Sequence, residues 1–420
     1  MGDSIDILVL GNGFDVACGL PTNYSDFFKW RVETNKSDYK LLDDLILNNE
    51  YIEGFKFQNT NYGNDFVTSD VLEYGYSTRS TEGELFGGFN LNLWDILFYT
   101  EFVMDNNCSP TNYEMMNHRI KWSNIESEIY NFVNMSFESN IGSHSSSRKY
   151  PTFSDLKNRK RGTNDRLKGM KLKFVFYTLQ YLVETYQLNE YGNLFEFLDY
   201  DIILNELNKF EKSFTEYLHF IRDNYDEKYD KEANLLVKKM FPNQCKIFYL
   251  SFNYTSLYSR LYYDSGTHVH GRFDGDIIFG IDSSGIDASN KAFKFTKTRR
   301  KMVAKNKFVP ISIPSTNLVQ SINFFGHSLS SADYSYFKSI FDFYSIYSSN
   351  IVLVFFFQKY GERSSDELLN EQSDLIAQLL RNYGKTLPNQ LDGENLLHKL
   401  LLENRLRIEE ITIDRFKLHK

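Results

Sequence analysis

The sequence predicts an α/β fold in which a Rossmann-like parallel sheet carries a large helical insertion and a helical C-terminal tail. Three short apolar runs have the length and composition of strands that are buried on both faces. These are Ile5–Leu10 (IDILVL), Lys246–Phe252 (KIFYLSF) and Ile351–Phe357 (IVLVFFF). Glycine or polar residues follow the first two runs, and the segment between them has the apolar spacing of helices.

The composition of the 420-residue chain is that of a globular protein, with 42% hydrophobic and 24% charged residues. We expect its 37 Phe and 29 Tyr residues to fill much of the core. The net charge of -8 gives the chain as a whole no attraction to nucleic acids or anionic membranes. Three cysteines are too few for a disulfide framework, and the longest apolar run, Ile351–Phe357, is too short to cross a bilayer. We therefore expect a cytoplasmic protein.

The first predicted strand ends at a glycine-rich turn, and we expect a helix to follow. Glycines let the backbone approach a phosphate, and a helix that begins there points its N–H groups at the anion. The dehydrogenase fingerprint has its third glycine where this chain has Val16, so that class is excluded. A glycine turn without a ligand is the alternative. The residues predicted to bind a nucleotide here are Gly11, Asn12, Gly13, Phe14 and Asp15.

Residues 31–241 are predicted to form a helical insertion. Apolar residues recur at helical spacing in Trp122–Met135, Lys173–Tyr186 and Leu204–Ile221. The serines, proline and charges of Ser139–Gly162 predict an exposed loop within this insertion. The nucleotide-binding domain then comprises residues 1–30 and 242–360.

Two further strands and two helices complete the predicted fold. Ile277–Ile281 and Ser321–Gly326 are short apolar runs that we expect to be strands. Asp366–Gly384 and Glu394–Glu410 have helical spacing, so residues 361–420 are predicted to be a helical C-terminal segment.

A second set of candidate site residues follows the second predicted strand. Asn253 and Thr255 come directly after it, and His268 and His270 precede Gly271. Two histidines separated by one residue point to one face of an extended segment, as metal ligands do. No cysteine or carboxylate stands at a spacing that completes a tetrahedral set, so we predict no metal. A buried His270 satisfied by hydrogen bonds is the alternative without a ligand.

A third set lies at the end of the run Ser321–Gly326. It consists of Gly326, His327 and Ser328, with Asp333 a few residues further on. Taken one at a time, these residues are typical of turns and helix caps. Ligands of open parallel sheets bind where the strands have their carboxyl ends, so we expect the three sets to meet at that edge.

Together the three sets resemble a known family. The chain is similar to the AbiH family of bacterial phage abortive-infection proteins in LGNGFDVACGLPTNYSDF, in FNYT followed by HVHG and IIFGID, and in GHSLSSADYSYF. The motifs occur in the expected order, and the helical insertion contributes little beyond WSNIESE. The resemblance implies an anti-phage abortive-infection effector.

A more distant similarity is to the sirtuin-like domains of bacterial defence systems, which bind NAD on a Rossmann-like sheet and in several cases hydrolyse it. This similarity implies that Asn253 stands at the asparagine of their central loop and that His270 is their catalytic histidine. The loop at Gly326 corresponds to their late glycine-polar loop. Thr255 stands where they have an aspartate, which places catalysis in question more than binding.

Cleavage of the bond between nicotinamide and ribose passes through an oxocarbenium-like centre and requires a positioned water. The Asn253 amide can hold that water or a ribose hydroxyl, and His270 can accept a proton as general base. Asp15 and Asp282 are alternative partners for the ribose hydroxyls. The sequence thus predicts an NAD glycohydrolase with Asn253 and His270 as catalytic residues. The further residues predicted to bind NAD are Thr255, His268, Gly271, Gly326, His327, Ser328 and Asp333.

Two other functions stay open. The threonine at position 255 favours a nucleotide-binding sensor without turnover. Two basic runs, Lys157–Lys173 and Lys291–Lys307, suggest an RNA-directed nuclease or toxin, but the acidic total charge argues against a general nucleic-acid binder. The expected partner is a nucleotide, and a phage-derived trigger and a homo-oligomer are left open.

Overall fold

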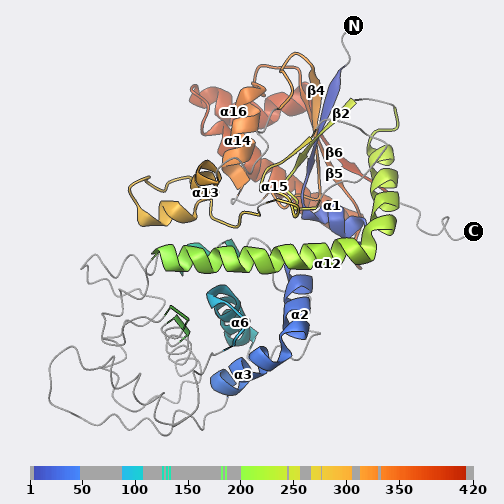
Figure 1. Cartoon of the computed structure of the whole chain (residues 1–420). Coiled ribbons are helices and arrows are strands. Elements are labelled where there is room, and N and C mark those ends of the chain that lie inside the picture. The colour runs from blue at the N-terminus through green and yellow to red at the C-terminus, as the bar shows by residue number, and fades with distance from the viewer. Residues whose placement is uncertain are drawn as a thin grey trace, which may run out of the picture. The chain divides into compact units, whose positions relative to one another are not determined.

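The computed structural model contains a six-stranded parallel sheet with helices on both faces (Figure 1). It describes residues 4–47, 88–106, 125–126, 129–130, 132–133, 181–182, 185–186, 200–243, 246–255, 266–275, 277–304, 313–329 and 333–412. The strands are β1 (Ile5–Leu10), β2 (Lys246–Ser251), β3 (Gly266–His268), β4 (Val319–Phe325), β5 (Val352–Phe357) and β6 (Leu406–Glu410).

Helices account for most of the remaining described residues. The helices before β2 are α1 (Asn12–Ala17), α2 (Tyr24–Thr34), α3 (Lys36–Leu47), α6 (Leu93–Asn106) and the long α12 (Tyr200–Met240). The C-terminal half contains the 3-10 helix η1 (Lys291–Phe295), α13 (Lys297–Val303), α14 (Tyr334–Phe343), α15 (Ser365–Gly384) and α16 (Gln390–Leu402).

The strand order of the sheet is β3-β2-β1-β4-β5-β6. This is the order of a doubly wound Rossmann sheet. Strands β1 to β3 are added toward one edge and β4 to β6 toward the other, so the order reverses between β1 and β4. Ligands of such sheets bind in the crevice beyond the carboxyl ends of these two strands. The predicted α/β, Rossmann-like fold class is therefore confirmed, and the fold directs attention to the loops after β1 and β4.

The strands form because their side chains alternate between two buried faces. Ile7 and Val9 of β1 join an apolar cluster that also contains Phe324 of β4 and Phe355 of β5. The rings of Phe324 and Phe355 are stacked across the two strands, with centroids 4.4 Å apart. Leu8 of β1 is equally buried and belongs to the opposite face.

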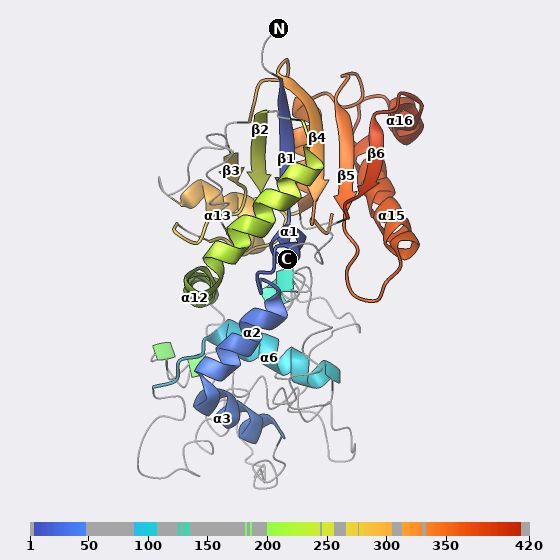
Figure 2. The same cartoon turned by 90° about the vertical axis from the view of Figure 1, so that its right-hand side faces the viewer.

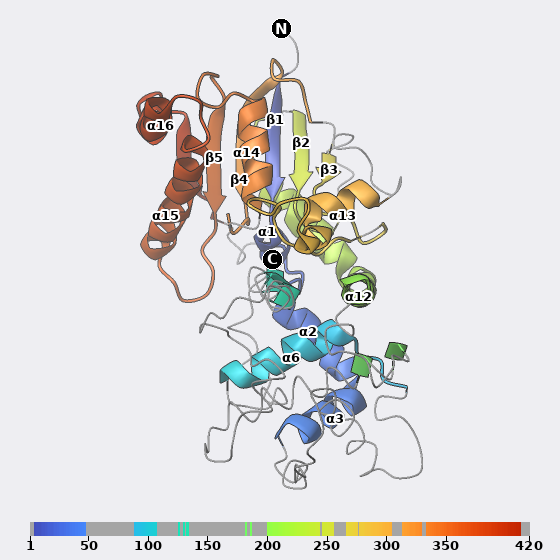
Figure 3. The ribbon, with the colours of Figure 1, turned by 90° about the vertical axis from the view of Figure 1, so that its left-hand side faces the viewer.

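Helices cover each face of the sheet. Helices α14, α15 and α16 contribute Phe341, Leu379 and Leu400 to the cluster around Ile7, and Figure 3 shows α14 in front of β1 and β4. Figure 2 shows the later part of α12 in front of β1 and β2 on the other face. Burial on both faces explains why the strands read as continuous apolar runs in the sequence.

The chain divides into two compact units. We call the first the sheet unit; it comprises Met1–Asn23, Phe214–Ile286 and Thr296–Lys420. The second, the helical unit, comprises Tyr24–Ser213 and Asp287–Phe295. Helix α12 begins in the helical unit and ends in the sheet unit.

The helical unit has an aromatic core with two buried carboxylates. The rings of Tyr24, Phe98 and Phe210 are packed together, which confirms that aromatic residues serve as core filler. Asp95 accepts hydrogen bonds from the guanidinium of Arg31 at 2.8 and 3.2 Å. Glu206 accepts from the backbone N–H of Leu93 and from three side chains, those of Tyr181, Tyr186 and Lys209. Each carboxylate is thus satisfied by partners from other segments, as burial of a charge requires.

Several predicted elements are confirmed, and two are wrong. Leu204–Ile221 lies inside α12, and the described residues of the other two predicted insertion helices are helical. The predicted loop Ser139–Gly162 and the first basic run, Lys157–Lys173, lie outside the described residues.

The predicted strand Ile277–Ile281 is not a strand. Its residues are buried, but only Ile281 forms a bridge, with Thr296. The backbone of Ile278 instead donates to the carbonyl of His270. A short apolar run indicates that its residues are buried, but a buried segment need not pair with a strand.

The predicted helix Glu394–Glu410 ends early. Helix α16 stops at Leu402, Asn404 has a φ of 53°, and the chain then forms β6 beside β5. Apolar residues at Leu406 and Ile408 alternate with charged ones, which is the pattern of an edge strand. The described part of the C-terminal segment also contains the helices α15 and α16, as predicted.

Helices α15 and α16 cross at two glycines. A Cβ atom at Gly393 would lie 2.1 Å from the carbonyl oxygen of Gly384. Alanine within a helix is normally favoured over glycine by about 1 kcal/mol, but this contact cannot relax without moving backbone. We expect Gly393→Ala to lower the free energy of unfolding by about 1–3 kcal/mol in urea titrations.

Gly275→Ala is the matched control, because a Cβ there meets only the carbonyl oxygen of Arg272, at an ordinary 3.6 Å. Unchanged or raised stability of the Gly393 variant would show that the two helices do not cross at these glycines.

Candidate functional site

The loops after β1 and β4 touch at the point where the strand order reverses. The backbone N–H of Gly11 donates to the carbonyl of Phe325 at 3.0 Å, and that of Gly13 donates to Gly326 at 2.8 Å. A Cβ atom at Gly11 would lie 2.4 Å from Cα of His327, so only glycine fits. Gly326 has a φ of 70° and equally close contacts to Gly13. The glycine turn therefore joins two loops of the protein.

This contact changes what the glycine turn offers to a ligand. The N–H groups of Gly11 and Gly13 donate to carbonyls of the β4 loop and cannot donate to a phosphate at the same time. Phe14 is buried, and its ring meets that of Phe325 at 5.9 Å, edge to face. Asn12 and Gly13 remain partly accessible at the start of α1.

A buried cluster around Asp333 follows the carboxyl ends of β3 and β4. One Asp333 oxygen, Oδ1, lies 2.9 Å from Nε2 of His270 and 3.0 Å from Nζ of Lys297. The other, Oδ2, lies 3.4 Å from Nε2 of His327. Three segments, the β3 loop, α13 and the β4 loop, thus place donors on one carboxylate.

The hydrogen bonds fix the tautomers of both histidines. A carboxylate only accepts, so Nε2 of His270 carries the hydrogen that faces Asp333 and Nδ1 is left as an acceptor. His327 accepts from the backbone N–H of Leu329 through Nδ1, so its hydrogen is on Nε2 as well. When a carboxylate accepts a hydrogen bond from one ring N–H of an imidazole, the other ring nitrogen can accept a proton as general base.

Burial and nearby lysines determine the charges of the cluster. Burial, together with the charge of Lys297, lowers the pKa of His270 to about 4, so this imidazole is neutral near pH 7. Burial alone would raise the pKa of Asp333, but Lys297 and the histidine hydrogen bonds hold it well below its usual range. Burial also lowers the pKa of Lys301 to about 8, and its Nζ lies 5.8 Å from the centre of the Tyr336 ring.

Asp15 forms a second buried carboxylate at this edge. Its Oδ1 accepts from the hydroxyl of Tyr229 at 2.8 Å, and its Oδ2 accepts from that of Thr255 at 2.5 Å. The side-chain amide of Asn253 also acts on the charge of this carboxylate. Burial raises the pKa of Asp15 to about 6, although each of these donors opposes the rise.

Asn253 lies shortly after β2 and contacts His268, the first histidine of the HVHG motif. Its backbone carbonyl accepts from Nδ1 of His268 at 2.9 Å. The flanking rings of Phe252 and Tyr254 lie 5.3 and 6.5 Å from the ring of His270. The side-chain Oδ1 of Asn253 is buried and has no hydrogen-bond partner. A buried acceptor of this kind is costly unless a water or a ligand satisfies it.

Comparison with protein families identifies the origin of these motifs. Residues 7–357 match the model of a family described as bacteriophage abortive infection AbiH. The chain belongs to the AbiH family. Its function is accordingly bacteriophage abortive infection. No curated protein and no solved structure matched the chain.

The matched region of this AbiH chain contains all of the predicted site residues. The structure brings the three predicted sets to the same sheet edge, where Asp333 joins His270 to His327 and Asp15 accepts a hydrogen bond from Thr255. Gly271, with a φ of 92°, turns the chain directly after His270. Ser328 is exposed in the loop that follows β4.

Asp282, the alternative ribose partner, is engaged within the protein. Its carboxylate accepts from the hydroxyl of Ser335 at 2.7 Å and from the backbone N–H groups of Ser335 and Ser284. These contacts hold the start of α14, which is a structural role.

Two residues of the site lack any signal in the sequence. Lys297 belongs to a basic run, where charge normally faces solvent, yet its side chain is only 3% exposed and its ammonium binds Asp333. Tyr229 lies within a helical pattern, 214 residues from its partner Asp15. Only the fold brings such residues to the site.

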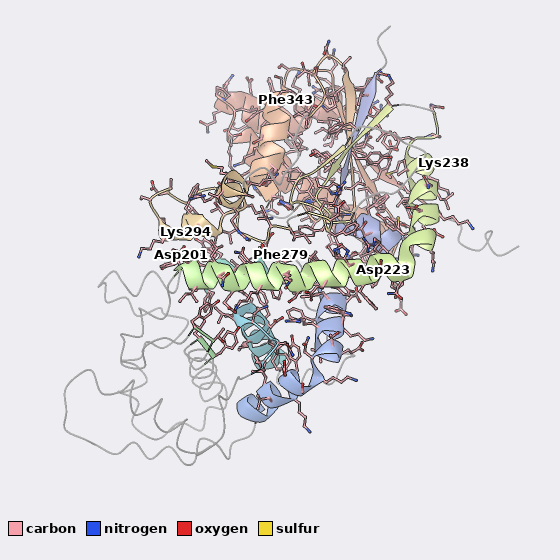
Figure 4. The ribbon with its side chains drawn as sticks, viewed as in Figure 1. Asp201, Asp223, Lys238, Phe279, Lys294 and Phe343 are labelled. Atoms are coloured by element: carbon pink, nitrogen blue, oxygen red, sulfur yellow. The ribbon has the colours of Figure 1, made fainter. Side chains whose placement is uncertain are left out.

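Three cations in the described part of the second basic run bind groups of their own unit. Lys294 pairs with Asp201 in the helical unit, as Figure 4 shows, at a distance of 2.8 Å. In the sheet unit, Lys297 pairs with Asp333, and buried Arg300 donates to the carbonyl of Phe279. Two of these three cations, Lys297 and Arg300, are buried and bind groups of the sheet unit itself.

Neither a metal cluster nor a membrane span is found where the structure is described. His268 and His270 have different partners, and no three His, Cys, Asp or Glu side chains of the described residues are grouped to hold a metal ion. Over the same residues, every helix is too short or too polar to cross a membrane.

The buried ion pair between Asp333 and Lys297 yields a stability prediction. Asp333→Asn leaves a buried ammonium without its counter-charge, so we expect the free energy of unfolding to fall by about 3–5 kcal/mol. The double variant Asp333→Asn/Lys297→Met removes both charges and should recover part of that loss.

Asp223→Asn is the control, because it removes one charge of the exposed pair with Arg222 and should cost less than about 1 kcal/mol. Urea titrations of the four proteins provide the comparison. Equal losses in the single and double variants would mean that the two charges are not paired.

The raised pKa of Asp15 predicts how stability depends on pH. The folded protein binds the proton more tightly than the unfolded chain, so this contribution is fully present below the unfolded pKa of 3.8 and is lost as the pH rises through about 6. Over that range, the wild type should lose about 3 kcal/mol of unfolding free energy relative to Asp15→Asn.

Urea titrations between pH 4 and pH 7 measure this difference, and Asp374→Asn, an exposed position on α15, controls for the residue type. Parallel pH profiles of the wild type and Asp15→Asn would contradict a raised pKa.

Proposed function

We propose that the chain acts in abortive infection by hydrolysing NAD at the bond between nicotinamide and ribose. The observation that carries this proposal is the presence, after the neighbouring strands β3 and β2, of a neutral imidazole held by Asp333 and a buried Asn253 oxygen without a hydrogen-bond partner. Both lie at the carboxyl edge of a doubly wound sheet, where nucleotides bind in this fold. The distant similarity of the motifs to sirtuin-like defence domains supports the choice of NAD.

The residues present match the requirements of the reaction. The C–N bond breaks, its electron pair leaves with nicotinamide, and the oxygen of water bonds to the ribose carbon. The proton released by that water passes to Nδ1 of His270 in this proposal. Asn253 Oδ1 accepts a hydrogen from the water or from a ribose hydroxyl. Lys301, whose charge acts on His270, supplies positive charge for the phosphates.

The test is the loss of NAD and the appearance of nicotinamide and ADP-ribose, followed by chromatography with purified protein. We expect His270→Ala and Asn253→Ala to lower the rate at least 100-fold, about the contribution of a general base or a positioning group. His398→Ala, at an exposed histidine of α16, is the matched control and should keep the wild-type rate.

The same metabolites are measured in phage-infected bacteria that express the wild type or the His270 variant, since infection supplies any activator. NAD that stays intact both with purified protein and in infected cells would rule out hydrolysis.

A nucleotide sensor without turnover is the second candidate. The observation that favours it is the pKa of His270, which burial lowers to about 4 and which makes the imidazole a weak base near pH 7. Binding of NAD measured by calorimetry, without any loss of NAD in purified protein or infected cells, would establish this function instead.

A further inference from the structure

Strand β6 ends the sheet with an open edge. Within the described part of the chain it pairs with β5 alone, and Figure 2 shows it as the last strand of the sheet. The strand at the opposite edge, β3, has three residues, whereas β6 has five. Natural proteins keep edge strands short because an unpaired edge binds other chains. The longer edge at β6 is therefore a candidate interaction surface.

The hydrogen bonds to β5 determine which backbone groups of β6 face outward. The carbonyl of Arg405 and the N–H of Ile411, which flank β6, both bond to β5. In a parallel ladder, alternate residues of a strand bond to the same neighbour, so the odd-numbered residues of β6 face β5. The N–H and C=O groups of Leu406, Ile408 and Glu410 consequently point away from β5, along the open edge.

The side chains of β6 alternate as well, between the two faces of the sheet. Leu406 and Ile408 are partly buried against the core to which α15 and α16 contribute. Arg407 and Glu409 belong to the opposite face and are exposed. Two charges of opposite sign thus stand on one face of the edge strand, on either side of Ile408.

We propose that β6 pairs with β6 of a second copy of the chain, antiparallel and centred on Ile408. A two-fold axis at Ile408 places Leu406 opposite Glu410 of the second copy, and these three residues are the ones with outward N–H and C=O groups to exchange. The same axis places Arg407 directly opposite Glu409 of the second copy, once on each side of the axis. Opposite charges at such positions stabilise a strand pair.

The charges select this register over its neighbours. Moving the axis by one residue places Arg407 opposite Arg407 of the second copy, or Glu409 opposite Glu409, and like charges directly opposite each other are destabilising. Charged residues on an edge strand normally prevent pairing with other chains. In β6 they disfavour the neighbouring registers and favour the one centred on Ile408.

Pairing in this register also buries apolar surface. The two Ile408 side chains lie opposite each other on the face covered by α15 and α16, next to the apolar core of each copy. The strand lies beyond residue 357, where the match to the AbiH family ends. The proposed dimer is therefore a property of this chain and need not extend to other members of the family.

Charge-reversal variants of the full-length protein test the proposal, with the dimer Kd measured by analytical ultracentrifugation over a dilution series. We expect the wild type to sediment as a dimer. Arg407→Glu and Glu409→Arg each place like charges opposite one another, so each should raise the Kd at least about 10-fold. An equimolar mixture of the two variants restores both opposite-charge pairs and should dimerise, as should the double variant Arg407→Glu/Glu409→Arg.

Lys212→Glu, at an exposed position of α12, is the matched control and should leave the Kd unchanged. Circular dichroism checks that each variant is folded. A monomeric wild type would overturn the proposal, as would single variants that dimerise as tightly as the wild type or a mixture of the two that stays monomeric. None of these results depends on NAD, so failure of the proposed dimer is distinguishable from failure of the proposed hydrolysis.

Discussion

The buried carboxylate of Asp333 is the interaction on which the rest of the site depends. It gathers an ammonium and two imidazoles from segments that the sheet alone would only bring near one another. Apolar burial is non-directional and sets no side-chain orientation, whereas a carboxylate with two oxygens assigns each donor a place. The sheet thus determines the edge, and Asp333 determines the geometry at that edge.

The pKa values of the two buried carboxylates at this edge are shifted in opposite directions. Asp333 has a buried lysine beside it and stays ionised, whereas Asp15 is surrounded by hydroxyl and amide donors and takes up a proton near pH 6. Paired groups whose pKa values are driven apart by their surroundings are characteristic of sites that transfer protons. His270 is hydrogen-bonded to Asp333, and Thr255, two residues after Asn253, is hydrogen-bonded to Asp15.

The sequence was informative where a signal is local. Apolar runs predicted β1, β2, β4 and β5, because strands buried on both faces are continuous in composition. The short strand β3 and the half-exposed β6 were missed, since three residues, or an alternating pattern next to a helix, give too little signal. The same limit explains the wrong assignment of Ile277–Ile281.

The residues of the candidate site also differ in whether a local sequence pattern could reveal them. Glycine after a strand and a histidine pair in an extended segment are local patterns, so Gly11, His268 and His270 could be chosen from the sequence. Their actual partners are long-range. Lys297 and Tyr229 carry no pattern that distinguishes them from other charged or helical residues, and Gly13 faces Gly326, which is more than 300 positions away. Contacts of this kind follow from topology, and a single sequence does not reveal topology.

Strand β6 has a consequence for where the family domain ends. The region shared with AbiH proteins stops at Phe357, the last residue of β5, yet β6 continues the hydrogen bonding of β5 by one more strand. Helices α15 and α16, which also follow Phe357, supply Leu379 and Leu400 to the same core as Ile7. A chain cut at the shared boundary would therefore expose a hydrophobic strand edge and an uncovered core face, both of which promote aggregation. The residues that match the family end at Phe357, whereas the sheet and its core extend beyond that residue to β6.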